Sequence, residues 1–312
     1  MADTPSRILP FGSLVTAMVT PFTADGAVDF DATAALATKL VDDGCDGLVV
    51  SGTTGETSTL EDSEKEDLYR VVAETVGDRA RVIAGTGTNH TSHSVEMARR
   101  AERAGAHAQL VVTPYYNKPT QSGVLAHFDA VAEASDLPIM IYDIPGRSAI
   151  PITTDTMFRL AENPRVGALK DAKADFAAVT RVLAGTDLDV YSGDDGLTLP
   201  WMAAGAVGVV SVSAHVATAQ FRALVDAATA GDFVEARRIH FALDPVIRAV
   251  MTHIPGAVSA KHILHLQGVL ANAVVRLPLV EADERELAPV LADLVEAGWD
   301  LAASRSPQVT SA

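Results

Sequence analysis

Short apolar segments rich in β-branched residues alternate along the chain with longer segments whose apolar positions recur at helical spacing. Most of the short segments are continuous apolar runs, which is typical of parallel strands covered on both faces. The pattern predicts eight strands, at 13–19, 47–50, 81–84, 108–112, 138–142, 166–169, 188–191 and 207–210.

The longer segments predict helices between and after these strands. Several end directly before a glycine, and the segment 60–76 opens with acidic and hydroxyl residues that can cap a helix. The predicted helices lie at 30–43, 60–76, 92–104, 122–134, 154–161, 174–183, 197–204 and 218–230. Eight strand–helix units in unbroken alternation indicate an α/β protein, a (β/α)8 TIM barrel.

Beyond the barrel the pattern is wholly helical, with further helices predicted at 233–252, 258–267 and 284–297. We therefore expect the barrel over residues 1–230, an appended C-terminal helical layer over 231–303 and a disordered tail over 304–312. The length of 312 residues suits one barrel of roughly 250 residues with additions.

Composition narrows the class of protein. Hydrophobic residues make up 48% of the chain, so a large core can be buried. The net charge, 24 − 40 = −16, opposes binding to nucleic acid and to anionic membranes, but it is compatible with a local cationic pocket. The apolar stretch 197–220 is interrupted by Pro200, Gly205 and Gly208, which favours a helix and a buried strand over a membrane span. Because there is one cysteine and no secretory signal in residues 1–12, we expect a cytoplasmic location.

Lys170 ends the sixth predicted strand and is the strongest candidate for chemistry. A buried ammonium loses hydration, so its pKa falls, and a neutral amine condenses with carbonyl carbons to form a Schiff base. A lysine that reaches solvent, or that pairs with Asp171 or Asp194, is the commoner case for such a position taken alone. Lys173 is a weaker candidate because it falls in the following loop.

Other chemically distinctive motifs follow other predicted strands. They are GTTGE at 52–56, PYYNKP at 114–119, YDIPGR at 142–147, SGDD at 192–195 and SVS at 211–213. In a barrel of this type the carboxyl ends of the strands form one rim, where the active site lies. The sequence therefore predicts that these motifs surround Lys170.

The residue types in these motifs suit a small anionic substrate. The glycines around Thr53 and Thr54 permit a tight turn whose N–H groups can hold a carboxylate, although an ordinary capped loop has the same composition. Tyr142 can carry a proton if Thr53 and Tyr116 are hydrogen-bonding partners, or it can be a core aromatic. The planar fork of Arg147 suits a carboxylate, and a surface role is about equally compatible.

Metal and nucleotide motifs are absent from the sequence: there is no HExxH motif, P-loop or complete dinucleotide fingerprint. Nothing near Asp194 and Asp195 completes a set of metal ligands, so we interpret this pair as a solvated or hydrogen-bonding acidic turn.

As a set, the motifs resemble the pyruvate-dependent class I aldolases of the dihydrodipicolinate synthase and N-acetylneuraminate lyase superfamily. Their order and spacing match from about Gly12 to Val216, which is most of the barrel. The adjacent Tyr115 and Tyr116, and Arg147 two residues after Pro145, are more similar to the synthase branch than to the sialic acid lyases.

This resemblance implies a role for each site residue. Lys170 forms a Schiff base with pyruvate, and a proton relay joins Tyr142, Thr53 and Tyr116, the last reaching in from a neighbouring subunit. The remaining substrate contacts are the pyruvate carboxylate with Thr53 and Thr54, main-chain contacts from Gly193 and Val210, and the carboxylate of L-aspartate 4-semialdehyde with Arg147.

The resemblance also implies the reaction: condensation of the two substrates to 4-hydroxy-tetrahydrodipicolinate, the first committed step of lysine and diaminopimelate biosynthesis. No metal or organic cofactor is required, and the usual assembly is a homotetramer built as a dimer of dimers. Two alternatives are another pyruvate-dependent aldolase acting on a sugar acid or other 2-keto acid, and a catalytically silent barrel. Arg147 and the paired tyrosines argue against the first, and the intact set around Lys170 argues against the second.

Two regions depart from the family pattern. The segment 256–261 reads GAVSAK where the family often has NPIPVK, and we expect this to affect subunit packing rather than chemistry. At the candidate allosteric cleft, Asn89 and Tyr115 are retained, but Lys65 and His93 stand where lysine-inhibited members carry a histidine and a glutamate. We therefore predict weak or absent feedback inhibition by lysine.

Overall fold

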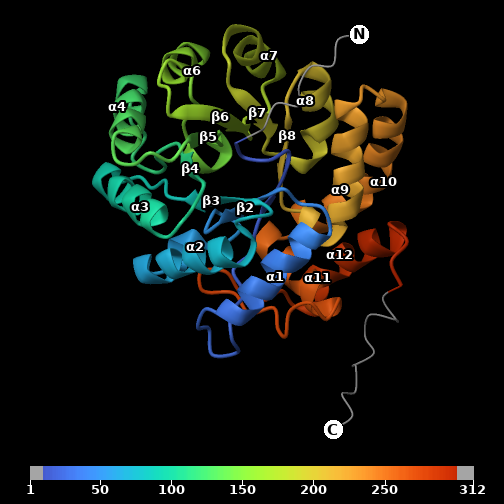
Figure 1. Cartoon of the computed structure of the whole chain (residues 1–312). Coiled ribbons are helices and arrows are strands. Elements are labelled where there is room, and N and C mark those ends of the chain that lie inside the picture. The colour runs from blue at the N-terminus through green and yellow to red at the C-terminus, as the bar shows by residue number, and fades with distance from the viewer. Residues whose placement is uncertain (1–9, 301–312) are drawn as a thin grey trace.

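The computed structural model describes residues 10–300, and its centre is a closed barrel of eight parallel strands. The strands are hydrogen-bonded in sequence order, and the first pairs with the last (Figure 1). Their bounds are β1 (Leu14–Ala17), β2 (Gly47–Val50), β3 (Arg81–Gly85), β4 (Ala108–Val112), β5 (Ile139–Asp143), β6 (Val166–Asp171), β7 (Asp189–Ser192) and β8 (Gly208–Ser211). The predicted (β/α)8 barrel is confirmed.

Helices surround this barrel on its outside (Figure 1). Their bounds are α1 (Phe30–Asp42), α2 (Asp62–Val76), α3 (Thr91–Arg103), α4 (Gln121–Ala132), α5 (Pro145–Ser148), α6 (Thr154–Ala161), α7 (Phe176–Gly185), α8 (Thr198–Ala204), α9 (Ala214–Thr229), α10 (Phe233–Met251), α11 (Gly256–Leu266) and α12 (Glu284–Glu296). Two short 3₁₀ helices, η1 (Thr57–Thr59) and η2 (Asp195–Leu197), lie at the ends of β2 and β7.

Side-chain caps explain where several helices begin. The carboxylate of Asp29 accepts a hydrogen bond from the N–H of Ala32 at 2.9 Å and starts α1. Helix α2 begins with a reciprocal capping box between Glu61 and Glu64. Each cap satisfies N–H groups that the helix itself leaves unpaired.

The structure differs from the sequence prediction at three kinds of places. Strand β6 runs on to Asp171, so Lys170 lies inside the strand rather than at its last position. The short helices α5, η1 and η2 were not predicted, because three or four residues are too few to show a helical period. Helix α9 begins at Ala214 instead of 218, and the non-helical φ of −136° at Ala217 marks a kink between its two parts.

The inside of the barrel is a packed core. Phe11 closes its amino-terminal end and lies edge-on to Tyr191, whose hydroxyl donates to the carbonyl of Gly12 at 2.6 Å. At Gly208 a Cβ atom would lie 1.9 Å from the carbonyl oxygen of Ser13, so only glycine allows β8 to approach β1 here. His215 is also part of this packing: its Nε2 accepts from the N–H of Val19 at 3.0 Å.

A second hydrophobic cluster joins the barrel helices to the C-terminal layer. It includes buried residues of α1, α2, α9, α10, α11 and α12, among them Leu36, Leu68, Phe221, Leu243, Leu264 and Val290. Helix α10 packs along α9, and α11 and α12 lie beside it (Figure 1). The proposed boundary at residue 230 therefore falls in a turn between two helices that share one core, and the tail predicted at 304–312 lies outside the described residues.

Two kinds of feature are absent from residues 10–300. No helix in this part of the chain combines the length and the apolar character that crossing a membrane requires. Nor does any group of three or more His, Cys, Asp or Glu side chains there have an arrangement that could hold a metal ion.

Candidate active site

Strand β6 places Lys170 at the carboxyl end of the barrel. Register pairs Lys170 with Tyr142 of β5 on one side and with Tyr191 of β7 on the other. Because alternate residues of a strand share a face, Lys170 points into the barrel like Ala168, which lies in the interior core. Its side chain is 5% exposed, and its Nζ lies 4.1 Å from the centre of the Tyr142 ring.

The surroundings of this amine favour its neutral form. Burial lowers the pKa of Lys170 to about 8; the charge of Asp195 opposes this shift, and the charge of Arg147 adds to it. Among residues 10–300, no carboxylate forms an ion pair with Lys170, so the commoner arrangement with Asp171 or Asp194 is not found. At pH 7 roughly a tenth of such amines are neutral and nucleophilic.

Lys173, the weaker candidate, lies in a different setting. Its Nζ is 3.5 Å from a carboxylate oxygen of Asp143 and donates to the carbonyl of Ile152 at 3.2 Å. Its amine is engaged by these two acceptors, which leaves Lys170 as the nucleophile candidate at this rim.

Tyr142 is buried beside Lys170 with its hydroxyl protonated. Burial raises the pKa of Tyr142 to about 12, while the charge of Arg147 and a hydrogen bond with Thr53 act in the opposite direction. A protonated phenol joined to a second hydroxyl can pass a proton without becoming charged for long. The structure therefore brings together Lys170, Tyr142 and Thr53 as the sequence predicted.

The turn at 52–56 is tightly folded around the predicted carboxylate site. The N–H of Glu56 donates to the carbonyl of Thr53 at 3.1 Å, and the Thr20 hydroxyl donates to the carbonyl of Gly55 at 2.8 Å. At Gly55 a Cβ atom would lie 3.0 Å from the carbonyl oxygen of Met18, so the turn passes close to the chain just after β1. The side chain of Thr53 is exposed at the mouth, and that of Thr54 is half-buried.

The other predicted contact residues lie on neighbouring strand ends. Gly193 follows β7, and a Cβ atom there would be 3.0 Å from Cγ of Lys170, so the backbone passes directly against the lysine. Val210 lies in β8, paired with Val15, and is 1% exposed. Arg147 lies on α5 with an exposed side chain, close enough to affect the pKa of both Lys170 and Tyr142.

Tyr116 is the predicted catalytic residue that this chain does not bring to its own site. Its side chain is 86% exposed, and its φ of 72° is in the left-handed region, which is unusual for a residue other than glycine. The sequence prediction that it enters a neighbouring subunit therefore remains a prediction. The loop that carries it is held by Asn117, whose side-chain amide donates to the carbonyl of Asn89 at 2.9 Å.

The pair Asp194 and Asp195 was interpreted as a solvated or hydrogen-bonding acidic turn, and the structure makes Asp195 its buried, hydrogen-bonded member. The side chain is 2% exposed and accepts hydrogen bonds from the N–H groups of Val212 at 3.2 Å and Ser213 at 2.8 Å. Asp194 is the exposed member of the pair and caps η2. Two adjacent aspartates give no sequence signal for which one is buried.

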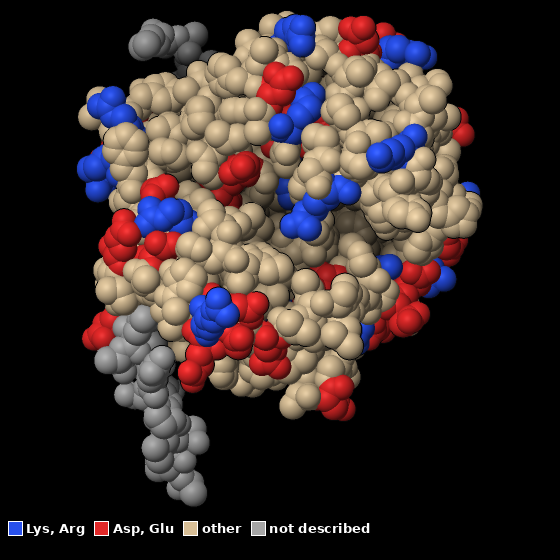
Figure 2. All heavy atoms as spheres, turned by 180° about the vertical axis from the view of Figure 1, so that it is seen from behind, with Lys and Arg blue, Asp and Glu red and all other residues tan. Residues whose placement is uncertain are grey.

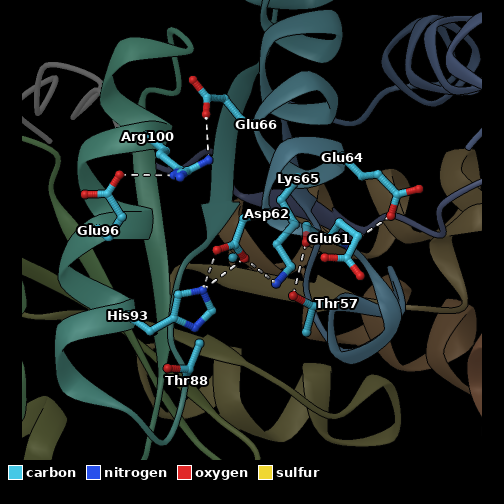
Figure 3. Close-up of polar contacts among 12 residues, drawn as sticks. Thr57, Glu61, Asp62, Glu64, Lys65, Glu66, Thr88, His93, Glu96 and Arg100 are labelled. Carbon is cyan, nitrogen blue, oxygen red and sulfur yellow. Dashed lines mark hydrogen bonds and ion pairs between the residues drawn. The ribbon is translucent and has the colours of Figure 1, made fainter.

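At the candidate allosteric cleft, Lys65 of α2 and His93 of α3 both point toward Asp62 (Figure 3). The Nε2 atom of His93 lies 2.9 Å from both carboxylate oxygens, and Nζ of Lys65 lies 3.4 Å from one of them. Burial acts to raise the pKa of Asp62, but the hydrogen bond and charge of His93 and the charge of Lys65 lower it overall. Asn89 and Tyr115 are half-buried, and they lie on the loops after β3 and β4.

The surface also has local cationic character despite its acidic total. The face opposite to the view of Figure 1 is hollowed near its centre, and Lys and Arg side chains lie along the edge of this hollow together with some Asp and Glu side chains (Figure 2). Such an edge suits an anionic small molecule, as the composition allowed.

A parallel barrel that holds a buried, unpaired lysine beside a hydrogen-bonded tyrosine at its carboxyl rim has the design of the class I aldolases. The model of the dihydrodipicolinate synthetase family matches residues 10–297, and the chain belongs to this family.

Known relatives agree along nearly the whole chain. A 4-hydroxy-tetrahydrodipicolinate synthase from Kineococcus radiotolerans is 55% identical over 93% of this chain and 94% of its own. The crystal structure of a dihydrodipicolinate synthase from Bacillus anthracis is 42% identical with a TM-score of 0.88, over 91% of this chain and 98% of that one. The chloride-inhibited dihydrodipicolinate synthase from Acinetobacter baumannii, complexed with pyruvate, is 34% identical with a TM-score of 0.89, over 92% and 99% of the two chains.

Proposed function

We propose that the protein condenses pyruvate with L-aspartate 4-semialdehyde to give 4-hydroxy-tetrahydrodipicolinate, the first committed step of lysine and diaminopimelate biosynthesis. Family membership and the activity named for the relative from K. radiotolerans support this proposal. The observation that carries it is the amine of Lys170, buried without a carboxylate partner and in contact with Tyr142.

In the first step the neutral amine of Lys170 attacks C2 of pyruvate. The carbonyl oxygen leaves as water, and an imine forms between Nζ and C2. Tyr142 supplies and recovers the protons that this exchange requires, with Thr53 as its hydrogen-bonding partner. Tyr116 of a neighbouring subunit completes the relay.

The turn at 52–56 orients pyruvate during this step. Thr53 and Thr54 hold the carboxylate through their hydroxyls and N–H groups, while the backbone at Gly193 and Val210 borders the rest of the molecule. A fixed carboxylate holds C2 within reach of Nζ, which turns the addition into an effectively unimolecular reaction.

In the second step the imine withdraws electrons from the pyruvate methyl group, which loses a proton to give an enamine. The enamine carbon attacks the aldehyde carbon of L-aspartate 4-semialdehyde, and the aldehyde oxygen gains a proton. The amine of the new chain then attacks C2 and closes the six-membered ring, which releases the amine of Lys170. Arg147 pairs with the carboxylate of this second substrate at the mouth of the barrel.

The assembly completes this proposal. An exposed Tyr116 on a loop of fixed backbone suits a residue that enters a partner's site, and we infer a homotetramer built as a dimer of dimers. A cytoplasmic location suits both a biosynthetic role and the single thiol of Cys45, which is buried and free.

Borohydride reduction in the presence of pyruvate tests the proposal. A reduced pyruvate adduct on Lys170, absent from Lys170→Ala, is the expected result of mass mapping. Lys261, a second buried lysine, is an internal control that should remain unmodified. Turnover with L-aspartate 4-semialdehyde but not with sugar acids would support the substrate, and an adduct at any other lysine would contradict the mechanism.

We also infer that free lysine is a weak inhibitor or none. Lys65 and His93 place an ammonium and an imidazole at the cleft, and the ammonium would repel that of a lysine ligand. Inhibition assays up to millimolar lysine test this, and an inhibition constant in the sub-millimolar range would overturn it.

A further inference from the structure

A buried ion pair holds the last residue of the turn at 52–56. Glu56, the last residue of the turn, is 5% exposed and has a left-handed φ of 58°. One of its carboxylate oxygens accepts from Nζ of Lys261 at 2.5 Å, and the other accepts from the N–H of Arg276 at 2.9 Å. Both donors belong to the C-terminal layer, more than two hundred residues away along the chain.

Lys261 makes several further contacts. It lies on α11, is 1% exposed, and donates a second hydrogen bond to the carbonyl of Val274 at 2.8 Å. Its Nζ also lies 4.0 Å from the centre of the Phe22 ring, which belongs to the loop after β1. An ammonium with this many partners is fixed in position.

Arg276 also joins the C-terminal layer to the barrel loops, through its side chain. Its guanidinium lies 4.5 Å from the Phe22 ring and makes two hydrogen bonds, each 2.7 Å long, with the carboxylate of Glu64. It also donates to the carbonyl of Thr59 at 2.9 Å, just beyond the turn. The loops after β1 and β2 are therefore both tied to residues of the C-terminal layer.

We propose that Lys261 and Glu56 are positioning residues for pyruvate: their ion pair fixes the turn at 52–56 so that Thr53 and Thr54 meet the substrate carboxylate. The N–H of Glu56 donates to the carbonyl of Thr53, so a shift of Glu56 moves the threonine as well. The C-terminal layer thereby contributes to substrate binding, in addition to the subunit packing expected for it from the sequence. This inference rests on the proposed function, because it assumes that pyruvate is the ligand of the turn.

The test measures how Schiff-base formation depends on pyruvate concentration, using borohydride trapping on Lys170. In Lys261→Met and in Glu56→Gln, the pyruvate concentration at half-saturation is expected to rise about tenfold, because a displaced turn holds the carboxylate less well. The rate at saturating pyruvate is expected to change less than about twofold, because the amine and its surroundings are untouched. An unchanged half-saturating concentration in both variants would overturn the proposal.

A double variant separates positioning from stability. Glu56→Gln combined with Lys261→Met removes both charges, so no unpaired charge stays buried and thermal stability should recover relative to either single variant. The half-saturating pyruvate concentration is expected to remain raised. Its return to the wild-type value together with stability would show a purely structural pair and would overturn the proposal.

Asp293→Asn is the matched control for damage to the C-terminal layer. It weakens the contact of α12 with Arg248 of α10 at 2.9 Å and does not touch the turn. We expect it to lower stability and to leave the half-saturating pyruvate concentration unchanged. A similar rise of that concentration in Asp293→Asn would mean that any destabilisation of the C-terminal layer weakens pyruvate binding. If the wild-type protein formed no adduct on Lys170, the proposed function would fail. If adducts formed with the same half-saturating pyruvate concentration in all variants, only the positioning role of Lys261 and Glu56 would be contradicted.

Discussion

Two buried lysines face different partners in this molecule, and the difference explains their roles. Lys170 in β6 is 5% exposed, and Lys261 on α11 is 1% exposed. Burial acts to lower the pKa of both. Lys261 has the Glu56 carboxylate and a carbonyl as acceptors, whereas Nζ of Lys170 lies over the ring of Tyr142. Burial alone therefore does not make a nucleophile; the absence of a bound acceptor does.

The supporting elements account for this difference. A residue at the carboxyl end of a barrel strand points into the open mouth, where a substrate can reach it. A side chain of the outer helical layer can instead lie buried between packed elements, where a charged group is stable only when it is paired. The same side chain thus becomes a reactant in one place and a fixed support in the other.

Replacing Lys170 by methionine gives the largest expected effect on activity. Lys170→Met removes the amine that forms the covalent intermediate, so turnover should fall by at least about a thousandfold. The free energy of unfolding should stay equal or rise, because methionine fills the space without a group that must be desolvated. Steady-state assays and denaturant unfolding check both parts; a large loss of stability would show that the amine has a structural partner.

The same substitution at Lys261 should mainly affect stability. Lys261→Met leaves the carboxylate of Glu56 buried without its cation, and the free energy of unfolding should fall by about 3–5 kcal/mol. Urea unfolding monitored by circular dichroism measures this change. Comparison with Lys170→Met controls for the loss of a buried lysine as such, and equal stability of the two variants would remove the distinction between the two sites.

The barrel could be predicted from the sequence because strands buried on both faces appear as continuous apolar runs. The boundary of β6 was wrong because Lys170 and Asp171 are charged residues that extend an apolar strand. The approach of Lys170, Tyr142 and Thr53 followed from the family motifs and from the rule that strand ends share one rim.

The contact between Glu56 and Lys261 could not be predicted in the same way. It joins residues 205 positions apart, and nothing in one sequence pairs a particular glutamate with a particular lysine. The segment 256–261 differs from the family pattern except at its final lysine, and that lysine alone reaches the turn. The burial of Asp195 rather than Asp194 depends on the N–H groups of Val212 and Ser213, which only the folded chain brings near.

The pH dependence of activity should follow the titration of Lys170. With a pKa of about 8, Lys170 is mostly charged below pH 7, so kcat/KM for pyruvate should rise about tenfold per pH unit up to that region and level off above it. Between pH 8 and 10.5 the unfolded chain binds more protons than the folded one, so stability should rise with pH in this window. A pH–rate profile without an inflection near 8 would contradict this assignment.

The smallest expected effects come from the charges that face Lys170. The charge of Asp195 raises its pKa, and that of Arg147 lowers it. Asp195→Asn should therefore move the rising limb of the pH–rate profile to lower pH, and Arg147→Met should move it to higher pH, with changes of about twofold to threefold in kcat/KM for pyruvate at pH 7. Asparagine still offers an oxygen to the N–H groups of Val212 and Ser213, so the loop should keep its shape.

Glu56→Gln provides the control for this pair of shifts. Glu56 is not among the charges that act on Lys170, so its neutralisation should leave the rising limb of the pH–rate profile at the same pH. The half-saturating pyruvate concentration should still rise. A limb that moved in Glu56→Gln would mean that the two lysines titrate as one system. A limb that stayed fixed in Asp195→Asn and Arg147→Met would mean that desolvation alone sets the reactivity of Lys170, because no nearby charge would then affect its protonation.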